Sequence, residues 1–539
     1  MQTAALVIAA IAFLAFAQIR LKRYLHIFQQ EEYDGPRFIG WMVRSVALDK
    51  RLTAALAMLA LAYAAGKSAW PVTVLAMFAI ALMVTAILEP DPEKAAKKKL
   101  AMTHRATRIH RLALAICAVL ALALISAAAS GNIGTMWTLG ALIAGVQLVP
   151  FTLVAANALL APVEKRVQDG FRIAAENRLR AVGPKVVGIT GSFGKTSVKH
   201  ILGHVLQMTT NTLYTPGSVN TVMGISRIIN ERLPDNCRYF VVEMGAYGPG
   251  SIARLCRFTP PDHGIITSIG AAHYERFKDL DTVARAKFEL AEAVAERNGK
   301  LVVHESVLDQ PHARKVVEQD RMRFIVVGES PTADVRIVAV EQKRDGLHVT
   351  LEKNDETVKL FAPLFGQHHG HNMALSYAFA VEMGIRPAHV IQAMRSTPQV
   401  AHRLELKSHP SGALYLDDAY NSNPQGFANA LDLLDQLRQD GGRRILISPG
   451  VAELGAKHDE VHTMLGDKAA RQTDVTIAVK PERIASFTEA FRKAGSGAQL
   501  IEVERFAEAQ AWMAANLGPR DVVLIENDLP DLYERVFVA

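Results

Sequence analysis

Residues Lys185-Val-Val-Gly-Ile-Thr-Gly-Ser-Phe-Gly-Lys-Thr-Ser197 decide the fold of the larger part of this 539-residue chain. A short β-rich run leads directly into a turn with two glycines, and a helical pattern continues from the Lys-Thr pair to about residue 207. In such a turn, backbone N–H groups and a helix N-terminus face a polyphosphate, Lys195 reaches its oxygens, and the Thr196 hydroxyl can bind Mg²⁺. This succession predicts a nucleotide-binding α/β domain.

The loop departs from the strict pattern G-x-x-x-x-G-K-[ST], because Ile189 stands where that pattern has its first glycine. Taken alone, the loop also fits an ordinary glycine turn that binds nothing. Seven further segments follow in order and decide between these two interpretations. They are residues 215–224, 241–246, 267–277, 286–289, 366–372 and 417–424, and the segment 453–455 together with His462.

The loop and these segments together resemble the Mur ligases, and among them the MurF type. The similarity includes Ile-Thr-Gly-Ser-Phe-Gly-Lys-Thr at 189–196, Gly-Gln-His-His-Gly-His-Asn at 366–372 and Asp-Asp-Ala-Tyr-Asn-Ser-Asn-Pro at 417–424. The resemblance implies an ATP- and Mg²⁺-dependent ligase that activates a carboxylate as an acyl phosphate, which an amine then converts into an amide. It also implies a C-terminal domain that closes over ATP bound to the central domain.

The resemblance assigns nucleotide-binding residues in the loop and beyond it. The loop residues are Thr190, Gly191, Ser192, Gly194, Lys195, Thr196 and Ser197. Outside the loop, Asn372, Arg403 and Asp418 resemble nucleotide contacts. A carboxylate such as Asp418 suits a ribose hydroxyl, and a guanidinium such as Arg403 suits phosphate.

The resemblance also assigns four catalytic residues, Lys195, Glu243, His273 and Lys287. Glu243 ends a β-rich run, where the carboxyl edge of a parallel sheet meets its ligands, and with Thr196 it can bind Mg²⁺. His273 resembles a second metal ligand, and Lys287 corresponds to a lysine that is carbamylated in many Mur ligases. Without the resemblance, Lys287 would be interpreted as a solvated surface lysine, and the histidines at 368, 369 and 371 as an alternative metal site.

Five apolar stretches precede the loop, at residues 4–18, 52–65, 70–88, 112–130 and 137–160. A membrane span needs roughly 20 predominantly apolar residues, so the last three stretches are long enough and the first two are short. Connections 19–51 and 89–111 hold seven Lys and Arg residues each, whereas the alternate connections hold only Lys67. By the positive-inside rule, this alternation predicts five spans, an outside N-terminus and a cytoplasmic remainder.

The charge is distributed unevenly along the chain. Residues 1–180 carry 20 Lys and Arg against 10 Asp and Glu, whereas residues 181–539 carry 40 against 43. The predicted catalytic part therefore lacks the basic excess of a nucleic-acid-binding protein. The run 94–111 is alternatively a basic nucleic-acid arm, but its position between two predicted spans accounts for its charge.

The predicted protein is thus a membrane-anchored α/β protein of four parts. These are transmembrane helices at 1–160, a helical connector at 161–180, a P-loop Mur-ligase central domain at 181–396 and a Rossmann-like C-terminal domain at 397–539. In the last, β-rich runs at 413–416, 444–448, 475–479 and 522–525 alternate with helical runs at 427–437, 487–494 and 507–517.

Two departures from the family pattern concern the substrates. MurF-type enzymes carry an N-terminal domain that binds a UDP-sugar peptide, whereas apolar spans occupy that place here. The segment 524–529 has acidic Glu526 and Asp528 where Lys and Ser are usual, and His304-Glu305 replaces an Asn-Asp pair. The activating residues are intact, and the acceptor side is not standard.

We therefore expect a ligase at the cytoplasmic face of the bacterial inner membrane. Its expected partners are a small-molecule or lipid-linked envelope precursor of the peptidoglycan type and an amino acid or peptide, with no nucleic acid. One alternative is a ligase for another envelope polymer, such as polyglutamate or an amino-acid-decorated polysaccharide. Another is an ATP-binding membrane scaffold without ligase activity. A transport ATPase is disfavoured, because no transport-ATPase signature accompanies the loop.

Overall fold

The computed structural model describes residues 2–45, 49–65, 71–89, 91, 99–246, 248–270, 279–419, 423–452 and 454–527. The chain divides into two compact units, one that contains the residues up to Val167 and one that begins at Gln168 and ends at Asp528. The boundary falls inside a single 48-residue helix, α6 (Thr135–Val182). The connector expected at 161–180 is therefore the last part of a helix that begins in the preceding apolar stretch.

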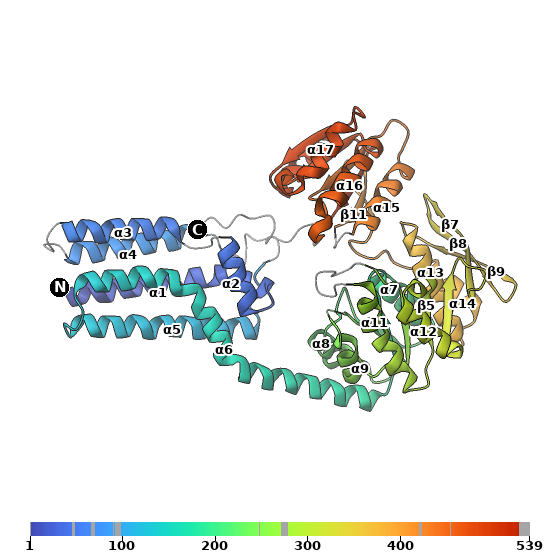
Figure 1. The fold of residues 1–539 in the computed structure, drawn as a ribbon, viewed down its shortest axis with the longest axis horizontal. Coiled ribbons are helices and arrows are strands. Elements are labelled where there is room, and N and C mark those ends of the chain that lie inside the picture. The colour runs from blue at the N-terminus through green and yellow to red at the C-terminus, as the bar shows by residue number, and fades with distance from the viewer. Residues whose placement is uncertain are drawn as a thin grey trace. The chain divides into compact units, whose positions relative to one another are not determined.

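The first unit is entirely helical in its described part. Besides the first part of α6, it contains α1 (Gln2–Gln30), α2 (Gly35–Arg44), α3 (Lys50–Ala65), α4 (Pro71–Leu88) and α5 (His104–Ala129). Helix α1 packs against α4 and α5, and α3 packs against α4 (Figure 1). Large apolar side chains also point outward from these helices, among them Ile8, Ile11, Leu61, Ile80, Ile87, Leu122 and Trp137.

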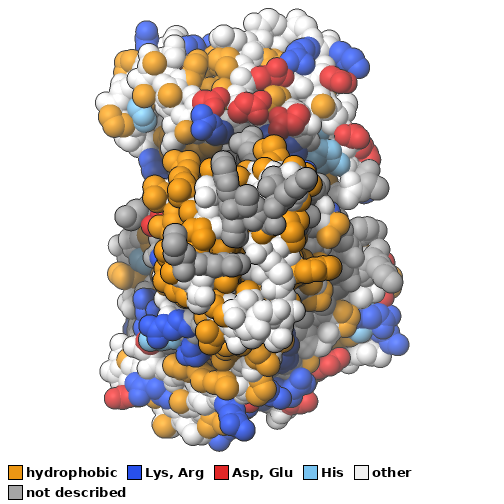
Figure 2. Space-filling view, turned by 90° about the vertical axis from the view of Figure 1, so that its left-hand side faces the viewer, with side chains coloured by type: hydrophobic (Ala, Val, Ile, Leu, Met, Phe, Trp, Pro, Cys, Tyr) orange, Lys and Arg blue, Asp and Glu red, His pale blue; other side chains and the backbone are white. Residues whose placement is uncertain are grey.

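Three helices in the described residues are long and apolar enough to cross a membrane: Thr3–Gln30, His104–Ala129 and Thr135–Val182. The remaining two apolar helices, Leu52–Ala65 and Val72–Leu88, are shorter. The stretch 4–18 is short in the sequence, but the helix that contains it is longer, because α1 continues through the charged residues that follow. The stretch 70–88, expected to be long enough for a span, forms one of the two shorter helices. Apolar side chains gather at the centre of the face in Figure 2.

A buried ion network explains how α1 continues past Arg20. The Arg20 Nη2 atom lies 2.9 Å from Asp49 Oδ2 and 3.0 Å from Glu89 Oε2, and these side chains are 4–5% exposed. Arg23 also pairs with Glu89. Asp49 and Glu89 belong to the two basic connections that the sequence places on one side of the helices, so one network joins both connections to α1.

Replacing Arg20 with Met should destabilise the first unit strongly. Asp49 would lose its ion pair while buried, and breaking a buried pair costs about 3–5 kcal/mol. Thermal unfolding of the detergent-solubilised protein measures the loss. Arg172→Met, which removes a more exposed pair with Glu176 on α6, is the control and should cost at most about 1 kcal/mol. Equal shifts for both variants would contradict the structural role of the network.

The second unit begins with a nine-stranded sheet of order β2-β3-β1-β4-β5-β6-β7-β8-β9. Its strands are β1 (Lys185–Thr190), β2 (Thr212–Tyr214), β3 (Tyr239–Glu243), β4 (His263–Ile266), β5 (Leu301–His304), β6 (Phe324–Gly328), β7 (Val335–Lys343), β8 (Gly346–Lys353) and β9 (Glu356–Ala362). The strands β2 to β7 pair in parallel, and β7, β8 and β9 form an antiparallel meander. The central strands β1 and β3 are almost wholly buried, as expected for a sheet covered on both faces.

Helices cover both faces of this sheet (Figure 1). One face packs against α8 (Val222–Arg232), α9 (Ser251–Phe258), α11 (Leu280–Ala295) and α12 (Pro311–Gln319). The other packs against α7 (Lys195–Gln207), α13 (His368–Glu382) and α14 (Pro387–Met394). The short 3₁₀ helices Glu305–Asp309 and Arg321–Arg323 complete this part. The result is an α/β domain with a central parallel sheet, as the sequence predicts.

A second sheet of six strands follows, with the order β10-β11-β15-β12-β13-β14. Its strands are β10 (Glu405–Ser408), β11 (Leu414–Asp418), β12 (Arg444–Ser448), β13 (Val475–Val479), β14 (Gln499–Val503) and β15 (Val522–Glu526). Only the edge strand β10 pairs antiparallel. Its helices are α15 (Pro424–Gln436), α16 (His458–Gln472), α17 (Ala485–Lys493) and α18 (Phe506–Asn516), with 3₁₀ turns at Gly455–Lys457 and Pro481–Ile484.

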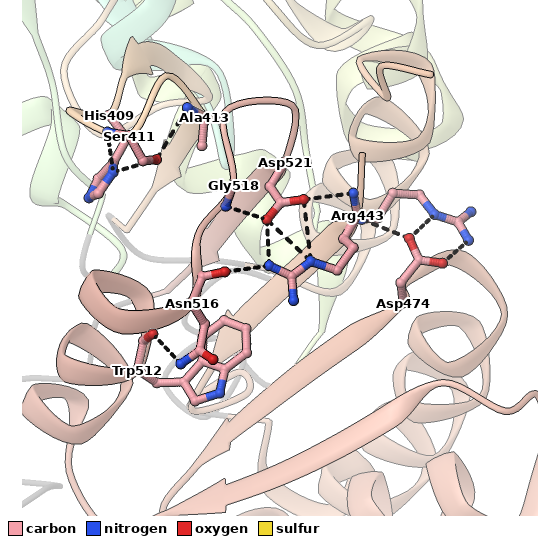
Figure 3. Close-up of polar contacts among 10 residues, drawn as sticks. His409, Ser411, Ala413, Arg443, Asp474, Trp512, Asn516, Gly518 and Asp521 are labelled. Atoms are coloured by element: carbon pink, nitrogen blue, oxygen red, sulfur yellow. Dashed lines mark hydrogen bonds and ion pairs between the residues drawn. The ribbon is translucent and has the colours of Figure 1, made fainter. Parts of the chain in front are cut away.

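Paired charges fasten the starts of the central strands of this sheet. Asp521, just before β15, accepts hydrogen bonds from the Arg443 backbone N–H at 2.9 Å and from its guanidinium Nη2 at 2.6 Å (Figure 3). Arg444 makes a similar pair with Asp474, just before β13. These contacts lie at the amino ends of the parallel strands, so they leave the opposite, carboxyl edge free for ligands.

Candidate active site

The loop between β1 and α7 has the backbone geometry that its glycines predict. Gly191 has φ +155° and Gly194 has φ +80°, both in the region that favours glycine. A Cβ atom at Gly191 would lie 1.9 Å from Thr267 Oγ1, and one at Gly194 would lie 2.7 Å from Asn372 Oδ1. The two glycines therefore allow the loop to turn tightly against β4 and α13.

The residues that follow β4 hold this loop in place. The Ser192 backbone N–H donates to the Ser268 carbonyl at 2.8 Å, and the Ser192 hydroxyl donates to the Gly270 carbonyl at 3.0 Å. The Phe193 N–H donates to the Ser268 hydroxyl at 3.0 Å. Because these contacts come from the chain beyond β4, the segment 267–270 shapes the phosphate-binding loop.

Lys195 lies folded back over the loop. Its ammonium donates to the Gly191 carbonyl at 2.6 Å and to the Ser192 carbonyl at 3.0 Å. Burial of the ammonium lowers the pKa of Lys195 to about 8. The charge of nearby Glu243 opposes this shift, and the charge of Arg403 adds to it. The cation is thus held at the position where it can turn towards an incoming phosphate.

Glu243 ends β3 beside the start of α7 and is 1% exposed. Its Oε2 atom accepts hydrogen bonds from the Thr196 hydroxyl at 3.0 Å and from the Lys199 ammonium at 2.9 Å. Its Oε1 atom accepts from the Asn220 amide at 3.3 Å. A carboxylate and a hydroxyl oxygen 3.0 Å apart at a helix N-terminus fit the oxygen ligands that Mg²⁺ prefers, so Thr196 and Glu243 would hold that ion.

Lys287 is buried on α11, with 4% exposure, and is not a surface lysine. Burial, and secondarily the charge of Lys195, hold the pKa of Lys287 well below its ordinary value. Among the described residues, no carboxylate or hydrogen-bond acceptor contacts its amine. Two residues further on, Glu289 accepts from the Gly250 and Ala253 N–H groups at the start of α9, which fixes α11 beside it.

Two family models match consecutive parts of this unit: the Mur ligase middle domain over residues 189–380, and the Mur ligase glutamate ligase domain over residues 402–526. The chain belongs to the Mur ligase family. It is accordingly an ATP-dependent enzyme that forms amide bonds.

Relatives and solved structures agree with this assignment. A UDP-N-acetylmuramoyl-tripeptide--D-alanyl-D-alanine ligase of Mycobacterium bovis is 28% identical over 431 residues, 74% of this chain and 83% of that enzyme. The Escherichia coli enzyme of that name is 30% identical over 292 residues, 53% of this chain and 62% of its own. MurF of Thermotoga maritima in complex with ADP has the same fold, with TM-score 0.57, 24% identity and coverage of 68% of this chain and 81% of that one. A MurF structure from Acinetobacter baumannii has TM-score 0.58, 23% identity and coverage of 67% and 77%.

The structure brings most of the predicted nucleotide contacts of this ligase together. The side chain of Asn372, on α13, lies against Gly194, where a Cβ atom would come within 2.7 Å of Asn372 Oδ1. Arg403 lies near enough to Lys195 and His368 for its charge to lower the pKa of both. Asp418, at the end of β11, accepts from the Leu404 N–H at 3.2 Å, and burial raises the pKa of Asp418 to about 6.

Some predicted residues lie outside the described part of the chain. His273, the expected second metal ligand, is among residues 271–278, and Asp528 follows the last described residue. Residues 420–422 and Glu453 are also outside it. Glu526 is described: it ends β15 with 0% exposure, in register beside Asp418. The acidic replacement on the acceptor side is thus buried at the carboxyl edge of the second sheet.

The histidines of the segment 366–372 form no metal site with other described residues. His371 stacks on His304 with ring centroids 4.8 Å apart, and burial lowers the pKa of His304 to about 4. In the described ranges, the cluster with metal-ligand geometry is His402, Glu405 and Asp417, and Lys407 lies 2.8 and 2.9 Å from its two carboxylates. A lysine thus already pairs with both carboxylates of that cluster.

Sequence reasoning missed Lys199 and the role of Glu305. Lys199 is 0% exposed and contacts Glu243. The sequence feature that could have identified it is a charged residue between the apolar positions of α7. Glu305 accepts from the N–H groups of Glu329 and Ser330 after β6, and a Cβ atom at Gly328 would strike it. The acidic half of the unusual His304-Glu305 pair is therefore structural.

Nucleotide affinity should fall as the pH rises through about 8. In the nucleotide-free protein, the Lys195 ammonium loses its proton in this pH range, and only the protonated lysine attracts phosphate. A hydrogen bond to a charged group contributes about 1.5–3 kcal/mol, so binding at pH 9.5 should be about tenfold or more weaker than at pH 7. Titration with a fluorescent ATP analogue measures this change. Lys195→Arg, which stays charged, should remove the pH dependence, and an unaltered profile would assign it to another group.

Proposed function

We propose that this ligase joins the carboxylate of a peptidoglycan-type precursor peptide to an amino acid or dipeptide. The observation that carries the proposal is the convergence of Lys195, Thr196 and Glu243 on one loop, with Lys287 near enough for the charge of Lys195 to lower its pKa. The names of the relatives, which act on a UDP-N-acetylmuramoyl-tripeptide and D-alanyl-D-alanine, support the substrate class. The carboxylate is activated as an acyl phosphate, and the amine then forms the C–N bond as phosphate leaves and the amine loses a proton.

Each residue of the loop has a role in the phosphoryl transfer. The N–H groups after Gly191 and at the start of α7 bind phosphate oxygens, and Lys195 neutralises the charge that develops on them. Thr196 and Glu243 orient the Mg²⁺ ion, which supplies further charge neutralisation when bound. Arg403 and Asp418 approach the nucleotide from the linker and the second sheet.

Lys287 serves this site as a carbamate. An uncharged amine is the form that reacts with CO₂, and the burial of Lys287 favours that form. The reaction adds CO₂ to the amine and releases a proton, so a group beside cationic Lys195 becomes an anion. Its oxygens are ligands that a divalent cation prefers, with His273 as a further ligand.

The amine-bearing substrate is less defined than the activated carboxylate. Buried Glu526 beside Asp418 adds negative charge where MurF-type enzymes carry a lysine. This difference favours an acceptor other than that of the relatives. A ligase for another envelope polymer, built from amino acids or carrying them, is the second candidate for this reason.

Membrane anchoring is part of the proposal. It is supported by the three long apolar helices, by outward-facing apolar side chains and by the basic connections 19–51 and 89–111. The Arg20 network, which draws Asp49 and Glu89 together, supports the placement of both connections on one side. The catalytic unit then works at the cytoplasmic face of the inner membrane.

Purified protein supplied with ATP, Mg²⁺ and lysate metabolites should form an amide product that mass spectrometry detects.

Lys287→Ala should be nearly inactive and partly restored by acetate, whose oxygens replace those of the carbamate. Lys287→Arg, which keeps a positive charge, should be inactive and not restored. Normal turnover in both variants would remove Lys287 from the site, and ATP hydrolysis without any amide would favour the scaffold alternative.

Cysteine labelling of intact cells tests the topology. A cysteine at Ile133 should react with a membrane-impermeant thiol reagent, because Gly131–Met136 holds no basic residue and is expected outside. A cysteine at Lys99 should be protected until the cells are opened. The three native cysteines are buried. A variant that lacks them serves as the background for the labelling. The opposite labelling pattern would place the ATP site outside the cell and refute the orientation.

A further inference from the structure

Lys199 is a buried cation for which the activation mechanism has no role so far. It lies one helical turn after Lys195 on α7, and its side chain is 0% exposed. Its ammonium donates to Glu243 Oε2 at 2.9 Å and also to the Gly217 carbonyl oxygen. One side chain thus contacts both the proposed metal ligand and the glycine loop 215–224.

Lys199 and Thr196 contact the same oxygen of Glu243. Glu243 Oε2 accepts from Lys199 and from the Thr196 hydroxyl, whereas Oε1 accepts from Asn220. A divalent cation held by Thr196 and Glu243 would compete with the Lys199 ammonium for the charge of this carboxylate. The competition is strong, because both partners are buried and screening by water is weak there.

We propose that Lys199 is a positioning residue that neutralises Glu243 until a divalent cation arrives together with the nucleotide. This inference rests on the proposed metal site at Thr196 and Glu243. In the empty site, Lys199 makes the carboxylate a poor ligand for a free metal ion. A nucleotide contributes phosphate oxygens, and the added ligands shift the balance towards the metal. Metal binding is therefore coupled to nucleotide binding.

The contact with Gly217 extends this coupling to the neighbouring loop. The Thr215 hydroxyl accepts from the Glu243 backbone N–H at 3.3 Å, and Asn220 contacts the Glu243 carboxylate. Any shift of Lys199 away from Glu243 thus moves a cation that also contacts the loop 215–224. That loop resembles a second glycine- and asparagine-containing loop of the family, so the arrival of the metal nucleotide would also act on the loop 215–224.

The test measures Mn²⁺ binding to the full chain in detergent, by electron paramagnetic resonance, without any turnover. In the unaltered protein, a non-hydrolysable ATP analogue should tighten Mn²⁺ binding about tenfold or more, within the usual range of coupling between ligands. Lys199→Met, which keeps the length and removes the charge, should bind Mn²⁺ about tenfold tighter without nucleotide. Adding Glu243→Gln to Lys199→Met should abolish this gain.

A matched control separates this role from a purely structural one. Val198→Ala removes a buried side chain from the same helix and loosens α7 without touching Glu243, so its Mn²⁺ affinity should not change. If folded Lys199→Met binds Mn²⁺ without nucleotide no more tightly than the unaltered protein does, the inference is overturned. The proposed function would remain intact. Should Lys199→Met fail to fold, the unaltered protein still decides, because equal Mn²⁺ affinity with and without the analogue would also overturn the inference. If Glu243→Gln keeps full affinity for Mn²⁺ with the analogue, the metal site itself is wrong.

Discussion

The parallel pairing of β1 between β3 and β4 is the constraint on which the active site depends. In this register Ile189 lies beside Glu243 and Thr190 beside Ile266, so three distant segments end at one edge of the sheet. The loop, the Glu243 carboxylate and the loop-anchoring residues 267–270 meet there for that reason. A slip of one residue would turn Glu243 to the other face of the sheet, and Thr196 would lose its partner.

Much of this arrangement could be predicted from the sequence, because it is encoded locally. The strand, the glycine turn and the Lys-Thr helix start are contiguous, so their geometry follows from neighbouring residues alone. Glu243 was predictable for a similar reason, since a buried run that ends in a carboxylate places that group at the sheet edge. In the second sheet, the apolar runs at β12, β13 and β15 were recognised, whereas half-exposed β14 and polar α16 were not, because their patterns are weaker.

Other features could not be predicted, because they depend on residues far apart in the chain. Whether Lys199 or Lys287 is buried is decided by elements that pack over α7 and α11. The length of α1 depends on Asp49 and Glu89, which neutralise Arg20 from other segments. The antiparallel meander of β7, β8 and β9 also escaped prediction, since its alternating strands carry no motif.

The folded-back Lys195 has a consequence for turnover. Its ammonium already has two carbonyl partners in the loop, so a phosphate exchanges one set of contacts for another and does not satisfy an empty one. The net gain from the exchange is smaller than the gross strength of the new contacts. The spent nucleotide can be given up by the reverse exchange, with the loop carbonyls taking the ammonium back. A loop built in this way lowers the net affinity for a bound phosphate.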